Sequence, residues 1–216
     1  MRAAISADEA PGQAPEAALA AALGSGGKLV LVEKTLEGVQ GYLVIAAEFA
    51  TARSINDLAR DARGLVCLAL HESIVDNLRL PLLPQTNRHR LGVAYTVSIE
   101  AREGVTTGIS AQDRALTVAA AIREGAGPED LGSPGHVFPI RVEHHETNAP
   151  RSAAAGAVRL CQVAGLRPAA VICAIMTTDG AMAGADSLFG YAAEHRLPIA
   201  TLARLAGSGP DHSSGK

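Results

Sequence analysis

The chain has 216 residues, a formal net charge of −3, 48% hydrophobic residues and 19% charged residues. This composition is typical of a folded globular protein, and the length is enough for one domain with a large core. The slight acidic excess gives no basic footprint of the kind that binds nucleic acid. Because aromatic residues make up only 3% and tryptophan is absent, the core must be packed from alanine, valine, leucine and isoleucine.

The N-terminal region carries acids and prolines before its apolar part, and no apolar run is long enough to span a bilayer. We therefore expect no secretory signal and no membrane partner. The three cysteines, Cys67, Cys161 and Cys173, are widely spaced among apolar neighbours, which is typical of reduced thiols in the cytoplasm. For Cys161 and Cys173 we expect the role of small buried hydrophobic residues.

In chain order, short β-rich runs alternate with amphipathic segments of helical period. Gly26 and Gly27 mark the turn into the first strand, and Ser54, Ser110 and Ser152 are the expected helix N-caps. The predicted helices are 16–23, 54–62, 72–80, 111–124, 153–164 and 186–195, and the predicted strands are 29–32, 42–46, 65–70, 93–100, 137–142, 170–176 and 199–202.

No internal repeat and no linker composition interrupts this alternation between residues 24 and 206. The pattern predicts an α+β fold in a single domain, with a mixed β-sheet flanked by helices. We place this domain at residues 15–206, between a flexible N-terminus at 1–14 and a disordered polar tail at 207–216.

Two runs of the sequence are distinctive, EGVTTGIS at 103–110 and PGHVFP at 134–139. Together with AEFAT at 47–51, GLVCLAL at 64–70 and YTVSI at 95–99, they resemble segments of the 3,4-dihydroxy-2-butanone-4-phosphate synthase family. The resemblance extends from about residue 17 to 206. It implies that family's fold, a homodimer with sites at the two-fold interface, and conversion of ribulose 5-phosphate to a four-carbon ketone phosphate and formate.

The chain departs from the family at its acidic and metal-binding positions. The family's acidic loop corresponds to EGVQGY at 37–42, where Gly38 replaces a magnesium ligand and Tyr42 replaces an acid. Ala153 stands where the family has a second magnesium ligand, and Ala174 where it has a glutamate. Glycine and alanine side chains offer magnesium no ligand, and tyrosine is a poor base near neutral pH. We therefore predict no metal site and no cofactor.

Several polar residues are candidates for the remaining chemistry. His136 is the predicted catalytic acid or base, with Tyr42 orienting the substrate; alternatively, His136 is a structural residue that fixes the turn at Gly135. Thr106 and Thr107 lie on a glycine-flanked turn before a helix, where they would bind an anion or a hydroxyl-rich ligand, or serve only as turn and capping residues.

Charged residues supply further candidates. Arg88, in the basic loop 87–90, and Arg151 are expected near the pocket mouth, either to bind an anion or to face solvent. Glu48 is either a structural or a site residue, and for the adjacent pair His144 and His145 we expect no metal site. We predict a small-molecule pocket lined by Tyr42, Cys67, Thr106, Thr107, His136, Ala153 and Ala174.

Three functions fit these observations, and whether the chain is an enzyme at all stays open. The first is a repurposed, metal-independent enzyme of specialised metabolism that uses the family's pocket on a less anionic substrate. The second is a non-catalytic binding or regulatory homologue. The third, ranked last, is a genuine riboflavin-pathway lyase that forms 3,4-dihydroxy-2-butanone 4-phosphate and formate. The function resides in the site, so the fold alone does not choose between them.

Overall fold

The computed structural model describes residues 12–36, 38–84 and 93–206. Within these ranges the chain forms one seven-stranded mixed sheet in the order β4-β5-β3-β6-β2-β1-β7. β1 pairs with β7 and β3 with β5 in parallel, and the other neighbours pair antiparallel. The strands are β1 Leu29–Thr35, β2 Gly38–Ala46, β3 Arg63–His71, β4 Ile99–Ala101, β5 Leu131–Val142, β6 Ala169–Ile175 and β7 Ile199–Thr201.

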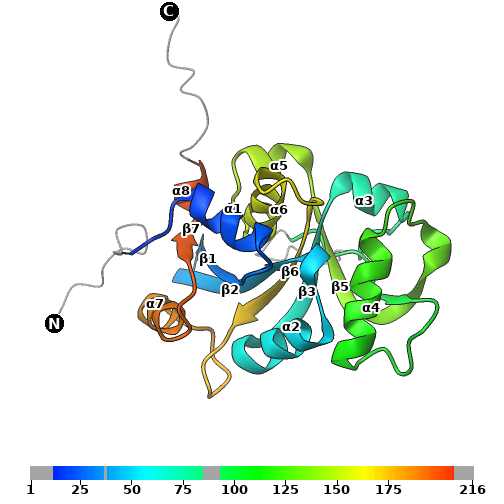
Figure 1. Cartoon of the computed structure of the whole chain (residues 1–216), viewed down its shortest axis with the longest axis horizontal. Helices are drawn as coiled ribbons and strands as arrows, with labels where there is room; N and C mark the ends of the chain where they lie inside the picture. Colours follow the sequence, from blue (N-terminus) through cyan, green and yellow to red (C-terminus); the bar gives the residue numbers. More distant parts are fainter. Residues whose placement is uncertain (1–11, 37, 85–92, 207–216) are drawn as a thin grey trace, which may run out of the picture.

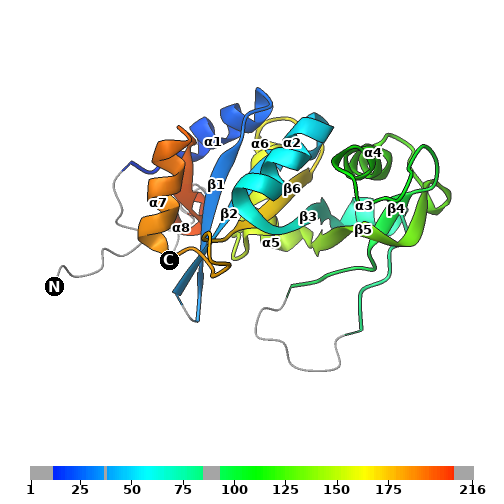
Figure 2. The same cartoon turned by 90° about the horizontal axis from the view of Figure 1, so that it is seen from below.

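Helices cover both faces of this sheet (Figures 1 and 2): α1, α6 and α8 pack on one face, and α2, α4 and α7 on the other. The predicted α+β single domain with a mixed, helix-flanked sheet is therefore confirmed. The helices are α1 Glu16–Gly24, α2 Ala52–Asp57, α3 Glu72–Asn77, α4 Ala111–Ile122, α5 His144–Asn148, α6 Ala153–Val163, α7 Ala185–Glu194 and α8 Leu202–Ala206.

The alternation of side chains along the strands divides the core in two. In β1, Val30 and Val32 pack with α2, α4 and α7, whereas Leu29 and Leu31 pack with α1 and α6. Successive residues of a strand point to opposite faces, so both faces of an apolar run are buried when helices cover both. The same alternation directs Glu33, the next residue on the Leu31 face, toward α6.

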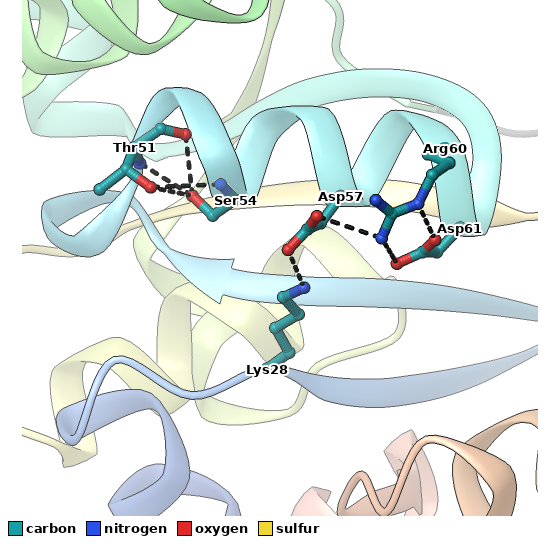
Figure 3. A network of polar contacts seen from close by, with 6 residues as sticks. All are labelled: Lys28, Thr51, Ser54, Asp57, Arg60 and Asp61. Atoms are coloured by element: carbon teal, nitrogen blue, oxygen red, sulfur yellow. Dashed lines mark hydrogen bonds and ion pairs between the residues drawn. The ribbon is translucent and has the colours of Figure 1, made fainter.

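Two of the three predicted helix caps are confirmed and one is displaced. Ser110 accepts a hydrogen bond from the Asp113 N–H, and Ser152 accepts one from the Ala155 N–H. The N-cap of α2 is Thr51, three residues before the predicted Ser54. Ser54 instead completes a capping box with Thr51, because it hydrogen-bonds back to the Thr51 backbone (Figure 3).

Ion pairs connect the end of α2 to the start of β1 (Figure 3). Lys28 Nζ lies 2.9 Å from Asp57 Oδ2, and Arg60 pairs with Asp57 at 3.1 Å and with Asp61 at 2.6 Å. These pairs are partly exposed, and surface ion pairs contribute little, about 0–1 kcal/mol each. They orient the helical turn η3 (Leu58–Ala62), whose apolar residues supply the larger stabilisation.

The predicted strand 93–100 is the main error in the fold. Only Ile99–Ala101 forms β4, and Tyr95 and Thr96 make isolated bridges to Ile140 and Leu82. The neighbouring strand β5 contains Pro139, whose carbonyl oxygen accepts a hydrogen bond from the Thr96 N–H. Proline has no N–H to donate to the carbonyl group of Thr96, so the ladder of hydrogen bonds is interrupted there. No helix in the described ranges has the length and apolar character needed to cross a bilayer.

Replacing Gly64 by alanine is expected to lower the free energy of unfolding by about 1–3 kcal/mol, the usual cost of overpacking. A Cβ at Gly64 would lie 2.3 Å from the carbonyl oxygen of Ala174, a backbone atom of β6 that cannot rotate away. Urea unfolding followed by circular dichroism measures the change. The control is Gly190→Ala in α7, where nothing lies within 4 Å and helix propensity predicts a gain of up to about 1 kcal/mol. Equal effects of the two substitutions would contradict this explanation.

Candidate functional site

A cavity of about 280 Å³ lies on the α6 face of the sheet, beside the N-terminus of that helix. Strand register places its floor residues side by side, because Tyr42 pairs with Ala174 and Cys67 pairs with Ile172. All four side chains point to the same face of the sheet. The walls come from Tyr95 and its neighbours before β4, and from the segment that leads into α6.

Glu33 is the central charged group of this cavity. Its Oε2 accepts a hydrogen bond of 2.6 Å from the backbone N–H of Ala153, the first residue of α6. Its Oε1 lies 3.2 Å from the hydroxyl of Tyr42, which also lies 3.0 Å from Oε1 of Gln40. A carboxylate at a helix N-terminus satisfies an N–H group that has no partner within the helix, and it interacts favourably with the helix dipole.

Burial controls the protonation of the groups around Glu33. Burial raises the pKa of Glu33 above its ordinary value of 4.5, and the hydrogen bonds from Ala153 and Tyr42 partly oppose this rise. Burial also raises the pKa of Cys67 to about 12. It raises the pKa of Tyr42 and that of Tyr95 well above their usual range, and for Tyr42 the negative charge of Glu33 adds to the effect. At neutral pH the cavity therefore contains two protonated phenols and a protonated thiol beside the half-buried carboxyl groups of Glu33 and Glu146.

Two arginines border the cavity, and among the described residues only Arg141 has partners for its guanidinium. Arg141 pairs with Asp76 at 2.5 Å and with Glu143 at 2.6 Å. Arg151 is exposed, and it forms no hydrogen bond or ion pair with any residue of the described ranges. Arg151 directly precedes Ser152, the N-cap of α6, so its side chain starts at the rim beside the helix N-terminus. This position suits the binding of an anionic group.

His136 lies outside this cavity. It belongs to β5, and its Nδ1 is 2.5 Å from Glu100 Oε1 of β4. The preceding Gly135 donates its N–H to the Ser98 hydroxyl, and a Cβ at Gly135 would lie 2.2 Å from the carbonyl group of Ile99. Within the described residues, His136 pairs with Glu100 and does not line the cavity that contains Tyr42, and its predicted role as an acid or base stays a prediction.

The threonine turn is held by one carboxylate instead of facing the cavity. The Thr106 hydroxyl donates to Asp113 Oδ2 at 2.8 Å, and the Gly108 N–H donates to the same oxygen at 3.0 Å. These bonds, the one from the Thr106 hydroxyl most of all, hold the pKa of Asp113 below its usual range. Thr107 is exposed, and neither threonine lines the cavity.

The other predicted site residues divide in the same way. Arg151, Ala153 and Ala174 line the cavity, as Tyr42 and Cys67 do. Glu48 lies elsewhere, because its carboxylate accepts a hydrogen bond from the Arg167 N–H. Arg88 lies outside the described residues.

Sequence reasoning missed Glu33 and Tyr95. The signal for Glu33 was present in the run LVLVE at 29–33, because extending the strand by one residue places the glutamate on the same face as Leu29 and Leu31. Tyr95 was assigned to a regular strand, where alternation does not predict that it would wall a cavity.

The structure thus defines an α+β protein with a largely apolar cavity that contains a few polar groups, at the junction of a mixed sheet and a helix N-terminus. The sequence model of the family described as 3,4-dihydroxy-2-butanone 4-phosphate synthase matches residues 17–207. A protein of that name from Pseudomonas putida is 41% identical over 186 residues, which cover 86% of either chain. Another from Rhodospirillum rubrum is 42% identical over 201 residues, 92% of this chain and 94% of the relative. The chain belongs to this family.

Solved structures agree with that assignment. A two-domain 3,4-dihydroxy-2-butanone 4-phosphate synthase from A. baumannii superimposes with a TM-score of 0.84 at 36% identity, covering 89% of this chain and 56% of that one. A synthase of the same name solved in complex with two magnesium ions has a TM-score of 0.82 at 31% identity and covers 89% and 94% of the two chains.

These relatives correct the order in which the sequence ranked the functions. A repurposed, metal-independent enzyme with a less anionic substrate was placed first, and the riboflavin-pathway lyase last. That ranking is wrong, because relatives at 41–42% identity over 86–92% of the chain are named as the synthase. The four changed positions, Gly38, Tyr42, Ala153 and Ala174, are few beside the similarity that extends over 186 to 201 residues.

The residues of the cavity do not reproduce a magnesium site of the kind that the resemblance implies. Gly38 has no side chain, and at position 153 the chain presents a backbone N–H, which is a donor and not a metal ligand. The carboxylate of Glu33 already accepts a hydrogen bond from this N–H. The described residues include no group of three or more histidines, cysteines, aspartates or glutamates placed to hold a metal ion.

The raised pKa of Glu33 predicts a pH dependence of stability. The folded protein holds this proton more tightly than the unfolded chain, so the contribution to the free energy of unfolding is full below pH 4.5 and is lost as pH rises through the higher folded pKa. Glu33→Gln should remove this decline, which urea unfolding between pH 4 and pH 8 would detect. Glu194→Gln, at an exposed position of α7, should leave the wild-type profile unchanged. A wild-type profile retained in Glu33→Gln would contradict the assignment.

Proposed function

We propose that the chain catalyses the reaction for which its relatives are named, the formation of 3,4-dihydroxy-2-butanone 4-phosphate and formate from ribulose 5-phosphate. The observation that carries the proposal is the 41–42% identity to synthases across nearly the whole chain. A second support is the cavity with its few polar groups, which lies where β2, β3 and β6 meet the N-terminus of α6.

The cavity residues suit a ketose phosphate. The uncommitted guanidinium of Arg151 at the rim is positioned for an anionic phosphate group. The hydroxyls of Tyr42 and Tyr95 stay protonated, so they can donate hydrogen bonds to a carbonyl or hydroxyl oxygen of the sugar. The volume of about 280 Å³ is appropriate for a small metabolite.

In this proposal, the site is built from other residues than the family's acidic and metal-binding ones. With Gly38, Ala153 and Ala174 in place of polar side chains, binding and proton transfer must come from Glu33, the tyrosines and Arg151. The homodimer and the cytoplasmic location expected from the sequence stay predictions.

The purified chain is expected to release formate from ribulose 5-phosphate, measured with a coupled formate assay and by NMR of the four-carbon product. Assays run with magnesium and with EDTA, and the Pseudomonas putida relative serves as the positive control. No formate in either condition, at substrate and protein concentrations where the relative is active, would overturn the proposal.

Arg151→Ala should raise KM for ribulose 5-phosphate by about tenfold or more, since hydrogen bonds to charged groups contribute about 1.5–3 kcal/mol. The matched control is Arg204→Ala on the exposed side of α8, which should leave KM unchanged. An unchanged KM in Arg151→Ala would remove this arginine from the phosphate site.

A further inference from the structure

We infer that Glu33 is the general base of this site, the carboxylate that takes the carbon-bound proton next to the carbonyl group of the ketose phosphate. This inference rests on the proposed function and assigns a role to a residue outside the acidic loop and the other changed positions.

The cavity has two acidic lining residues, and only Glu33 is suited to this role. The carboxylate of Glu146 accepts the N–H of Glu143 at 2.8 Å and caps α5. Glu33 projects from β1 toward the cavity floor, where one oxygen is fixed by Ala153 N–H and the other faces the Tyr42 hydroxyl. Each carboxylate oxygen has two acceptor sites, so these bonds orient the group and leave acceptor capacity for a substrate proton.

The surroundings favour proton transfer to this group at neutral pH. The titratable and charged groups that line the cavity with Glu33 are Tyr42 on β2, Cys67 on β3, Tyr95 before β4, Arg141 on β5, Glu146 on α5 and Arg151 before α6. The phenols and the thiol stay protonated, so none of these three competes as a base. Burial moves the pKa of Glu33 upward, in the direction of neutrality, which increases its strength as a base.

The proton transfer also explains why Tyr42 contacts Glu33. The substrate proton moves to a Glu33 oxygen, the C–H electron pair becomes the C=C bond of an enediolate, and the carbonyl π pair becomes a lone pair on the substrate oxygen. The negative charge thus passes from Glu33 to that oxygen. Once Glu33 is protonated it is a weaker acceptor, so the Tyr42 hydroxyl can donate to the new oxyanion while keeping its own proton.

A purely structural role for Glu33, as the acceptor of the first N–H of α6, makes a different prediction. An amide oxygen at the same place also accepts the Ala153 N–H, so Glu33→Gln preserves this hydrogen bond but cannot take a proton. A structural role therefore predicts a Glu33→Gln enzyme with normal chemistry, whereas a base role predicts loss of chemistry with substrate binding retained.

The experiment uses the full chain and compares wild type, Glu33→Gln, Glu33→Asp and the surface control Glu194→Gln. Two readouts are followed with ribulose 5-phosphate, formate release and exchange of the substrate's carbon-bound hydrogen in D₂O by ¹H NMR. We expect Glu33→Gln to lose about 10²- to 10⁴-fold in both rates with KM changed only a few-fold, and Glu33→Asp to recover part of the loss. Urea unfolding verifies that each variant is folded. If Glu33→Gln is unfolded, the pH–rate profile of Glu33→Asp decides instead, because a base role requires the acid limb of that profile to shift relative to wild type.

The outcomes separate this inference from the proposed function. Formate release and exchange that are equal in wild type and Glu33→Gln would overturn the inference and leave the function standing. Exchange that depends on Glu33 without formate release would overturn the function and support the inference. A wild-type protein that shows neither exchange nor formate release, at any pH from 6 to 9, would overturn both.

Discussion

The contact between the Glu33 carboxylate and the first N–H of α6 is the constraint on which the site depends. It joins the end of β1 to the helix that packs across β1, β2, β3, β5 and β6. The carboxylate loses hydration on burial, and a hydrogen bond from a helix N-terminus offsets part of that cost. The floor residues Tyr42 and Cys67 pack in the same apolar layer as α6 and also line the cavity beside its N-terminus.

Much of the fold was predictable because its signals are local. Apolar runs such as residues 65–70 and 170–176 read as buried strands, and Ser110 and Ser152 marked helix starts that the structure confirms. The error at 93–100 had a non-local cause, because the missing N–H of Pro139 lies on the partner strand, more than 40 positions away in the chain. The shift from Ser54 to Thr51 reflects a capping box in which both residues are polar and either could have been the N-cap.

The candidate site was predicted less completely, for a related reason. The family resemblance predicted that Tyr42, Cys67, Ala153 and Ala174 line one pocket, and they do line the cavity. A family resemblance indicates which residues lie close together in space, whereas composition does not. His136 and Thr106 were linked to the same cavity by their motifs. The structure instead gives each an acidic partner, Glu100 and Asp113 respectively, at the end of the sheet occupied by β4. Asp113 is 7 positions from Thr106, and Glu100 is 36 positions from His136. The motifs alone do not encode these pairings, which depend on how the chain folds.

The occupied helix end also decides where an anionic ligand can be bound. A helix N-terminus ordinarily attracts phosphate through its free N–H groups. In α6, two of the three N–H groups of the first turn already have acceptors, since Ala153 donates to Glu33 and Ala155 donates to Ser152. The negative charge of Glu33 would further repel a second anion at that point. For the proposed ketose phosphate, this arrangement favours a phosphate at the rim, where Arg151 has no partner among the described residues, and a carbonyl end that faces Glu33 and Tyr42.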